Sequence, residues 1–446
     1  MLIRREASGS WLQPLRTAAR SKIIGFALLV MMLGLVAFSQ HQRPLKDFRI
    51  SLSVSPFTEL RLLNGTTFTD GKVTAKTPEE LQRMFVSYGA NEVYARIATT
   101  QKYQNGFGDH SMNRGLERAR MAKALNLPFN PELGLFNIYG DVRCQPAPDF
   151  SDYPEIKVPG PWTSLTIDQM MPLLRLYATL AARQILSTGA KVRIWDLGNE
   201  VEFGSAGVAV QPMPGGCDDT AGGAGWYKAP DRVDPAIGRM SVVDLMKMSE
   251  TQRIAWLRSH VWPYEAKMLA AVADGIRSVD PHARFSTHVS GITSVQPGQA
   301  VAFFKAMREG GFAADELGVS YYPTSSAYPP DRWQAFKDMA TSVRRELGQP
   351  VFIAEFGYPS EKMKSGFIWN DAVKGYPLTP EGQASFIRDL VAWGVGTGTL
   401  SGIRPWAPDL AGTPWGPMSL FEFEGKTATS RPALNAITEG TRSSTQ

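Results

Sequence analysis

The chain has 446 residues, of which 43% are hydrophobic and 20% are charged, as is typical of a globular protein with a large core. Most of its net charge of +5 lies in residues 1–22, which hold five basic residues and one acidic residue, so the remainder is nearly neutral. This distribution excludes the extended basic surface of a nucleic-acid-binding protein. Two cysteines and five scattered histidines exclude the common zinc-binding patterns, and we expect neither a metal nor another cofactor.

Residues 23–39 are predicted to be a targeting segment. Residues 23–38 carry no charge and follow the basic leader at 1–22. The run is short for a membrane span, which needs about 20 apolar residues, and long for a signal-peptide core of roughly 7–15. An uncleaved signal anchor and a cleaved signal peptide both remain open, and either sends the remainder out of the cytoplasm. We expect a periplasmic or other extracytoplasmic protein, anchored to the inner membrane through 23–38 if the segment is retained, with residues 40–48 as a tether.

Beyond residue 48, strand patterns alternate with helical patterns. The eight predicted strands are 49–55, 92–98, 133–139, 192–197, 283–289, 317–323, 351–355 and 399–406. The predicted helices are 77–89, 112–127, 166–188, 249–279, 300–309, 331–347, 379–393 and 431–438. Such an unbroken series predicts a single (β/α)8 TIM barrel over residues 49–440. The alternative, an open doubly wound sheet, expects a Gly-rich turn after an early strand, and the sequence has none there.

A Gly-rich insertion follows the fourth predicted strand at about 203–240. It is too long for an ordinary connection, and such segments are usually functional. The insertion holds Cys217, whereas Cys144 lies in the Pro-rich stretch after the third predicted strand. Outside the cytoplasm these cysteines can form a disulfide that fastens the two loops together, and two free thiols are the alternative.

Two predicted strands end abruptly on a glutamate. The fourth strand leads to Asn199 and Glu200, and the seventh leads to Glu355. In a closed parallel barrel the carboxyl ends of all strands meet at one face, so both carboxylates should reach one cleft. Glycoside hydrolysis requires such a pair: an acid that protonates the leaving oxygen, and a second carboxylate across the anomeric carbon. The structural alternatives are a surface carboxylate at 200 and a helix-capping acid at 355.

Neighbouring residues suggest how the two carboxyl groups differ. Arg96, in the second predicted strand, is placed to keep Glu355 charged, and Tyr322, in the sixth, is placed to donate a hydrogen bond to it. Glu200 is then the protonated partner. Asn199 is predicted to bind the sugar hydroxyl beside the anomeric carbon.

Other residues compete for these roles. Asp196 and Glu202 are rivals for the acid, but the first falls inside the strand and the second beyond its end. Trp406, in the eighth strand, is the preferred platform for stacking a sugar ring. For each candidate tryptophan the alternative is a structural role in the hydrophobic core. The remaining candidate platforms are Trp162, Trp226 and Trp415.

Several stretches of the chain resemble clan A glycoside hydrolases, and within that clan family 53, the endo-β-1,4-galactanases. They are Leu197–Glu200, Leu317–Pro323, Ala354–Pro359 and the closing segment Trp415–Ile437. The resemblance implies Glu200 as acid/base, Glu355 as nucleophile and retention of the anomeric configuration. The ends of the third and eighth strands depart from the family pattern, which leaves galactan and an exopolysaccharide open as substrates.

We therefore expect a monomeric, retaining, endo-acting glycoside hydrolase of a β-linked polysaccharide. Arg96, Asn199, Tyr322 and Trp406 are the expected substrate-binding residues around the two glutamates. Two other functions remain open. One is a non-catalytic glycan-binding barrel in an envelope assembly, which would not need a matched acid pair. The other is a transglycosylase, which differs from a hydrolase only in its acceptor.

Overall fold

The computed structural model describes residues 48–104, 108–217, 227–364, 369–410 and 415–443. The predicted leader at 1–22, the segment 23–39 and residues 40–47 of the tether lie outside these ranges, as does Trp226. No helix within them is long and apolar enough to cross a bilayer.

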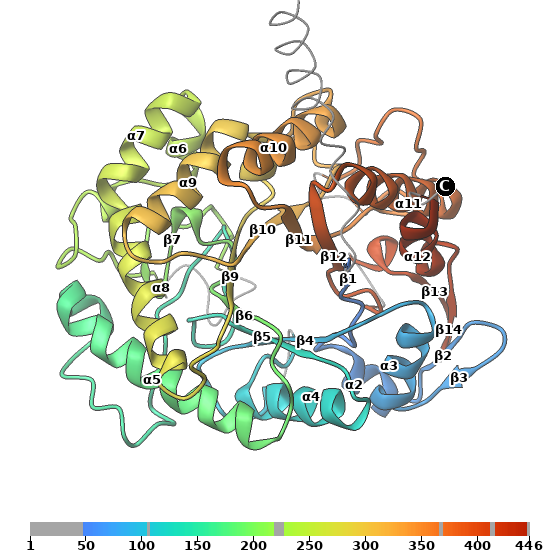
Figure 1. Cartoon of the computed structure of the whole chain (residues 1–446), viewed down its shortest axis with the longest axis horizontal. Helices are drawn as coiled ribbons and strands as arrows, with labels where there is room; N and C mark the ends of the chain where they lie inside the picture. Colours follow the sequence, from blue (N-terminus) through green and yellow to red (C-terminus); the bar gives the residue numbers. More distant parts are fainter. Residues whose placement is uncertain (1–47, 105–107, 218–226, 365–368, 411–414, 444–446) are drawn as a thin grey trace, which may run out of the picture. The chain divides into compact units, whose positions relative to one another are not determined.

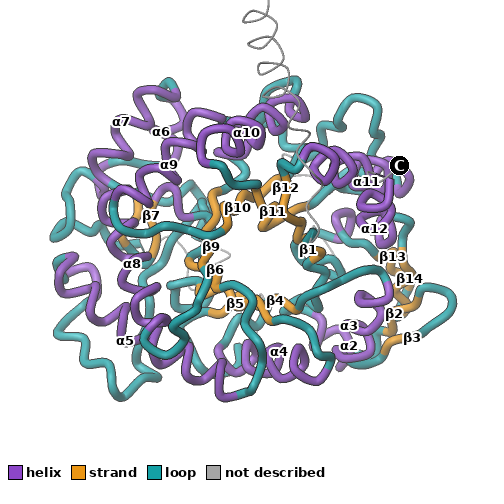
Figure 2. Tube along the Cα trace, viewed as in Figure 1, coloured by secondary structure: helices purple, strands orange, loops and turns teal. Residues whose placement is uncertain are grey.

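Eight parallel strands form one curled sheet (Figure 1). In order across the sheet they are β1 (Arg49–Ile50), β12 (Leu400–Pro405), β11 (Val351–Phe356), β10 (Glu316–Tyr321), β9 (Phe285–Val289), β6 (Trp195–Leu197), β5 (Phe129–Leu133) and β4 (Val93–Ile97). Figure 2 shows these strands around a common centre with the helices outside them. The arrangement is consistent with the predicted (β/α)8 barrel, in which the loops after the strands gather at one face.

Hydrogen bonds outside the strand ladders join the two ends of this strand order, and one of them is a backbone bond from the Asn91 N–H to the Ile50 carbonyl at 3.1 Å. The side-chain amide of Asn91 accepts a hydrogen bond from the Ile50 N–H at 3.0 Å and donates one to the Phe48 carbonyl at 2.9 Å. The Ser53 hydroxyl accepts from the N–H of Tyr94 at 2.9 Å. The chain that continues β1 therefore meets β4, and the sheet closes on itself at this seam.

Helices cover the outside of the strands (Figure 1). They include α3 (Pro78–Ser87), α4 (Met112–Ala124), α5 (Ile167–Ser187), α8 (Trp262–Arg277), α9 (Pro297–Glu309), α10 (Arg332–Leu347) and α11 (Pro380–Thr397). The start of α3 follows from its sequence: Thr77 accepts the N–H of Glu80, and Pro78 takes the first position, where no N–H is needed. Leu81 and Phe85, one turn apart, are fully buried on its inner face.

Three predicted elements differ clearly in their boundaries. The first strand, predicted at 49–55, forms a ladder only over Arg49–Ile50. The third strand is β5 at 129–133 rather than 133–139, and its alternating pattern is hidden because Asn130 and Glu132 point at buried arginines instead of apolar neighbours. The helix predicted at 249–279 is two helices, α7 (Glu250–His260) and α8. A proline in the first turn of α8 explains the break, since it cannot continue the preceding helix.

The sequence patterns also missed a small second sheet. It contains β13 (Phe421–Glu424), β14 (Thr427–Ser430), β2 (Thr67–Thr69) and β3 (Thr74–Ala75). Parallel pairing of β14 with β2 ties the end of the chain to its beginning. The described chain also contains the helices α2 (Thr58–Leu63), α6 (Val242–Lys247) and α12 (Ala433–Ser443) and the short turns η1 (Trp162–Ser164), η5 (Thr293–Val295) and η6 (Gly416–Met418).

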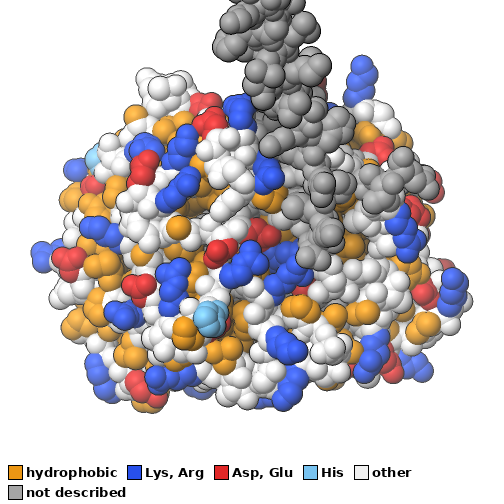
Figure 3. Space-filling model, viewed as in Figure 1, with side chains coloured by type: hydrophobic (Ala, Val, Ile, Leu, Met, Phe, Trp, Pro, Cys, Tyr) orange, Lys and Arg blue, Asp and Glu red, His pale blue; other side chains and the backbone are white. Residues whose placement is uncertain are grey.

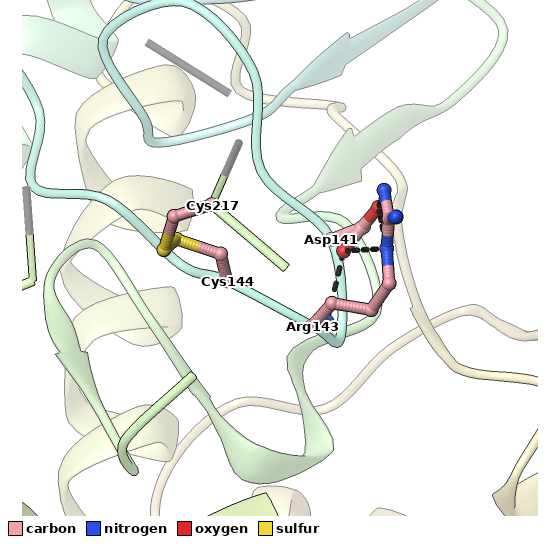
Figure 4. The surroundings of a disulfide bond; sticks show 4 residues. All are labelled: Asp141, Arg143, Cys144 and Cys217. Carbon is pink, nitrogen blue, oxygen red and sulfur yellow. Dashed lines mark hydrogen bonds and ion pairs between the residues drawn. A yellow bond between two sulfur atoms is a disulfide. The ribbon is translucent and has the colours of Figure 1, made fainter. Parts of the chain in front are cut away.

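The Gly-rich insertion is folded wherever the structure describes it. It begins with η2 (Val201–Phe203) and a hairpin of β7 (Gly204–Ser205) and β8 (Val208–Ala209), and η4 (Ile237–Arg239) lies near its end. Cys144 and Cys217 form a disulfide with their Cα atoms 5.2 Å apart (Figure 4). Of the two alternatives for the cysteines, the bridge is therefore the one observed.

Charges of both signs share the surface. On the face drawn in Figure 3, Lys and Arg side chains are interspersed with Asp and Glu side chains outside the grey atoms. That face carries no broad field of one sign, in line with the nearly neutral composition beyond residue 22.

Candidate active site

A sharp turn after β6 presents Glu200. Gly198 has φ of +73°, and Glu200 itself adopts a left-handed conformation with φ of 53° and ψ of 58°. A non-glycine residue in this region is uncommon, and such conformations concentrate at functional sites. The turn carries the Glu200 side chain into the protein, where only 6% of the residue is exposed.

The carboxyl group of Glu200 lies in a setting that favours its protonated form. Burial raises its pKa well above the usual value, and the negative charges of Glu355 and Asp141 add to this effect. One backbone donor opposes it: the N–H of Val142 donates to Glu200 Oε2 at 3.1 Å. A carboxyl group that keeps its proton at neutral pH can act as a general acid.

Glu355 lies near the end of β11 and is held by two donors from neighbouring strands. Arg96 Nη2, from β4, donates to Glu355 Oε1 in a buried ion pair. The hydroxyl of Tyr322, which follows β10, donates to Glu355 Oε2 at 2.7 Å. A cation and a hydroxyl both stabilise the ionised carboxylate of Glu355, whereas Glu200 accepts a backbone N–H and has no ion pair among the described residues.

Further charged residues hold Arg96 from inside the barrel. Arg96 Nε pairs with Glu132 on β5, and Arg404 Nη1 on β12 donates to the same carboxylate at 3.2 Å. Tyr94 donates to Glu132 Oε2 at 2.9 Å. These four residues and Glu355 form one largely buried network that spans four strands of the barrel wall, β4, β5, β11 and β12.

Asn199, the residue before Glu200, joins Arg96 to His288 and to the loop at Gly140. Its Oδ1 accepts from Arg96 Nη2 at 3.0 Å and from His288 Nε2 at 2.8 Å, while its Nδ2 donates to the Gly140 carbonyl at 2.7 Å. Burial lowers the pKa of His288 to about 4, so His288 is neutral and donates from Nε2. Asn199 is fully buried among these partners, and the binding of a sugar hydroxyl by its amide stays a prediction.

Neither rival for the acid role faces Glu355. Asp196 accepts from Arg404 Nη2 at 2.5 Å inside the barrel. Glu202 is fully buried and accepts from the N–H of Ser290 at 2.9 Å and the hydroxyl of Thr293 at 3.0 Å, which holds the loop after β9. Both carboxylates are already engaged in structural contacts.

An aromatic cluster lies beside Glu355. Tyr322 stacks on Trp369 with ring centroids 4.7 Å apart, and Trp415 packs edge-on against Trp369 and against Trp406 at 5.1 and 4.7 Å. Trp369, Trp406 and Trp415 are each partly exposed. Trp162 is different: it is buried, and its Nε1 donates to the Ala206 carbonyl at 2.6 Å, so it is a core residue.

A small cavity opens between β4 and the end of β12. Its lining includes Ser53, Arg96, His110, Trp406 and Pro408. Arg96 Nη1 is buried without a hydrogen-bond partner among the described residues. This donor belongs to the residue that pairs with Glu355 and lines the same cavity as Trp406, and it is suited to a substrate hydroxyl.

The structure thus brings together most of the predicted site residues and adds others. Glu200, Glu355, Arg96, Asn199 and Tyr322 are joined directly or through one residue, and Trp406 lies in the adjacent cluster. The sequence patterns missed Glu132 and Arg404 because they lie on strands whose polar inner residues do not look like catalytic positions. They also missed Trp369, which lies in a connection without a recognisable motif.

Comparisons with known proteins agree with this picture. The sequence model of glycosyl hydrolase family 53 matches residues 238–434, somewhat less than half of the chain. Among curated proteins no match is found.

Solved structures show the same fold. The GH53 catalytic domain of Ignisphaera aggregans is 17% identical with a TM-score of 0.63, and the match covers 88% of this chain and 96% of that one. A fungal β-1,4-galactanase is 18% identical with a TM-score of 0.60, covering 88% and 99%. The resemblance stated from the sequence is confirmed: this chain is a glycoside hydrolase, and family 53 is the family that it resembles.

Proposed function

We propose that this protein is a retaining, endo-acting hydrolase of a galactan-like β-linked polysaccharide, with Glu200 as acid/base and Glu355 as nucleophile. The observation that carries the proposal is the contrast between the two carboxyl groups. Glu355 accepts from Arg96 and Tyr322, whereas Glu200 is buried beside negative charges that raise its pKa. Retaining hydrolysis requires this division into one ionised and one protonated carboxyl group.

In the first step, Glu355 attacks the anomeric carbon while Glu200 protonates the leaving glycosidic oxygen. Arg96 and Tyr322 donate to the attacking carboxylate and fix its direction. A glycosyl ester of Glu355 and a free sugar hydroxyl result.

In the second step, Glu200 acts as a base and takes a proton from the water that cleaves this ester. The ester carries no negative charge, so one of the causes that raise the pKa of Glu200 disappears when it forms. The same carboxyl group can therefore give a proton first and accept one afterwards.

The proposed substrate rests on the family resemblance and on the aromatic cluster. Family 53 matches the part of the chain that contains Glu355, Tyr322 and the partly exposed Trp369, Trp406 and Trp415. Indole rings can stack on the apolar faces of successive sugars, as an endo-acting enzyme needs.

The disulfide supports an extracytoplasmic location for this activity. Bridges such as Cys144–Cys217 form and persist in oxidising compartments. The predicted export of the chain through residues 23–39 would deliver it to such a compartment.

The deciding experiment measures reducing sugar released from β-1,4-galactan, other β-glycans and any exopolysaccharide of the source cell. We expect galactan to be cleaved and the first product to keep the β configuration, seen by proton NMR before mutarotation. Glu355→Gln and Glu200→Gln are the test variants, and Glu422→Gln on the exposed edge of β13 is the matched control.

Cleavage with inversion would overturn the assignment of Glu355 as nucleophile. Cleavage of another glycan alone would replace galactan as substrate. If the wild-type protein binds a glycan but cleaves none of those tested, the non-catalytic barrel is favoured instead.

A further inference from the structure

One short turn in the loop after β5, residues 141–144, contacts Glu200. Asp141 and Cys144 exchange two backbone hydrogen bonds of 2.9 and 3.0 Å, which close the turn. Within it, the N–H of Val142 donates to Glu200 Oε2 at 3.1 Å. The next residue, Gln145, donates from Nε2 to the Asn199 carbonyl at 2.6 Å. The loop therefore holds both the side chain of the acid and the backbone before it.

The Gly-rich insertion fastens the same turn from its other side. Cys217 is bonded to Cys144, and the N–H of Met213 donates to the Arg143 carbonyl at 2.9 Å. A Cβ added to Gly216 would lie 2.6 Å from that carbonyl oxygen, so the two segments are in close contact. The turn cannot shift away from Glu200 without disturbing these contacts.

Asp141 brings a negative charge to this turn. Its side chain pairs with that of Arg143, which donates from Nη2 at 2.7 Å, and Figure 4 shows the two turned toward one another beside the disulfide. Arg143 partly offsets the charge that Asp141 presents to Glu200. The other ionisable groups that interact with Glu200 come from three directions: Glu355 on β11, Glu202 on η2, and Tyr322 and Tyr328 after β10.

We propose that Asp141 and the Val142 N–H are positioning groups for the general acid, fixed in place by the Cys144–Cys217 bridge. The inference rests on the proposed role of Glu200. Because Oε2 accepts from a backbone N–H, the transferable proton is carried by Oε1. The charge of Asp141 then makes loss of that proton less favourable, and the positive charge of Arg143 reduces this effect.

The test compares Asp141→Asn, Arg143→Gln and a control, Asp149→Asn. Asp149 is an exposed carboxylate farther along the same loop. The readout is the pKa of Glu200, followed by 13C NMR of protein labelled at glutamate carboxyl carbons. The resonance missing in Glu200→Gln identifies the group, so the measurement does not depend on turnover.

Opposite shifts are expected for the two variants of the turn. Asp141→Asn removes a negative charge and should lower the pKa of Glu200 by roughly 0.5 to 1 unit. Arg143→Gln removes the offsetting cation and should raise it, while Asp149→Asn should leave it unchanged. The basic limb of kcat/KM should move in the same directions, because it reports the acid of the free enzyme.

Loosening the turn without changing its charges provides the third arm. In Cys144→Ser/Cys217→Ser, near-ultraviolet circular dichroism checks that the barrel is folded. In this background Asp141→Asn should shift the pKa of Glu200 by less than it does with the bridge intact, because a loosened turn no longer fixes that charge beside the carboxyl group. An equal shift in both backgrounds would show that the bridge does not position Asp141.

An unchanged Glu200 pKa in both Asp141→Asn and Arg143→Gln would overturn the inference. Failure of the proposed function looks different: Glu200→Gln would then keep full activity, whatever its neighbours do. Shifts of the same sign in the two charge variants would also contradict the inference, since a merely structural role moves both in one direction.

Discussion

The two glutamates are held by different parts of the molecule. Glu355 lies in the barrel wall, and its donors Arg96 and Tyr322 come from β4 and the end of β10. Glu200 lies on a strained turn, and its one backbone donor, from Val142, belongs to a loop that a disulfide ties to the insertion. The barrel strands thus hold Glu355, the proposed nucleophile, whereas the loop after β5 and the Gly-rich insertion hold Glu200, the proposed acid.

The difference separates two requirements of the chemistry. A carboxylate that must stay ionised needs cations, and parallel strands can supply these from several sides of a closed wall. A carboxyl group that must hold and release a proton needs a setting of adjustable charge, and loops can provide this without altering the wall. Variants on each side should therefore fail in different ways.

The largest effect is expected at the glutamates themselves. Glu355→Gln should lower kcat on every substrate by roughly 10⁴-fold or more, because no nucleophile remains. Glu200→Gln should lower kcat by about 10²–10⁴-fold on polysaccharide but keep a fast first step on an aryl glycoside with a good leaving group. Stopped-flow release of the aryl group distinguishes them, and equal losses on both substrates would contradict the assignment.

Removal of Arg404 tests the barrel side. Its guanidinium is buried between Asp196, Glu132 and Asn130, so Arg404→Met leaves buried carboxylates without their partner. We expect the free energy of unfolding to fall by about 3–5 kcal/mol. Urea denaturation checks this, with Arg388→Met, at a partly exposed ion pair on α11, as a control of little effect. A stability loss no larger than that of the control would show that the network is not needed.

Removal of the disulfide tests the loop side. The bridge joins cysteines 73 residues apart, and a loop of this size predicts a loss of about 2–4 kcal/mol in Cys144→Ala/Cys217→Ala. The aryl-glycoside burst, which depends on Glu355, should survive in the folded variant, whereas polysaccharide cleavage should weaken. Differential scanning calorimetry and the two activity assays check these outcomes, and loss of the burst alone would contradict the division between wall and loop.

The smallest expected effect is on stability as a function of pH. The pKa of Glu200 is raised in the folded protein, so its contribution is most favourable below its usual value of 4.5 and is lost as the pH rises through the folded value. Glu200→Gln should therefore match the wild type near pH 4 and exceed it by about 1 kcal/mol or more at higher pH. Thermal unfolding across this range checks the sign, and a variant less stable at high pH would refute it.

Much of the fold can be predicted from the sequence because most strands are apolar runs with recognisable ends and the helices between them have recognisable caps. The runs that end at Leu197 and Glu355 are buried parallel strands, and the cap at Thr77 starts α3 where expected. β5 was misplaced for a physical reason: Asn130 and Glu132 face arginines, so neither an apolar run nor an alternating pattern marks the strand. A prediction that expects inward-facing strand residues to be apolar cannot locate a strand whose inward-facing residues are polar or charged.

The sequence predicted the parts of the candidate site in which a side chain lies in or at the end of a strand. It missed the parts in which a backbone group makes the contact. Glu200, Glu355, Arg96 and Tyr322 each mark a strand end or a strand interior. The donor at Val142 is an N–H, which every residue except proline carries, so no side-chain pattern could single it out. The partnership of Cys144 with Cys217 depended on where an insertion folds, which spacing alone does not specify.

The pairing of β1 with β12 has a consequence for how the protein is made. Arg49 of β1 pairs with Gly402 of β12, so the first strand finds its ladder partner only when nearly all of the chain is present. Contacts this distant in sequence form late in folding. The barrel wall therefore cannot be completed until the residues around Gly402 are available to pair with Arg49, however early β1 is synthesised.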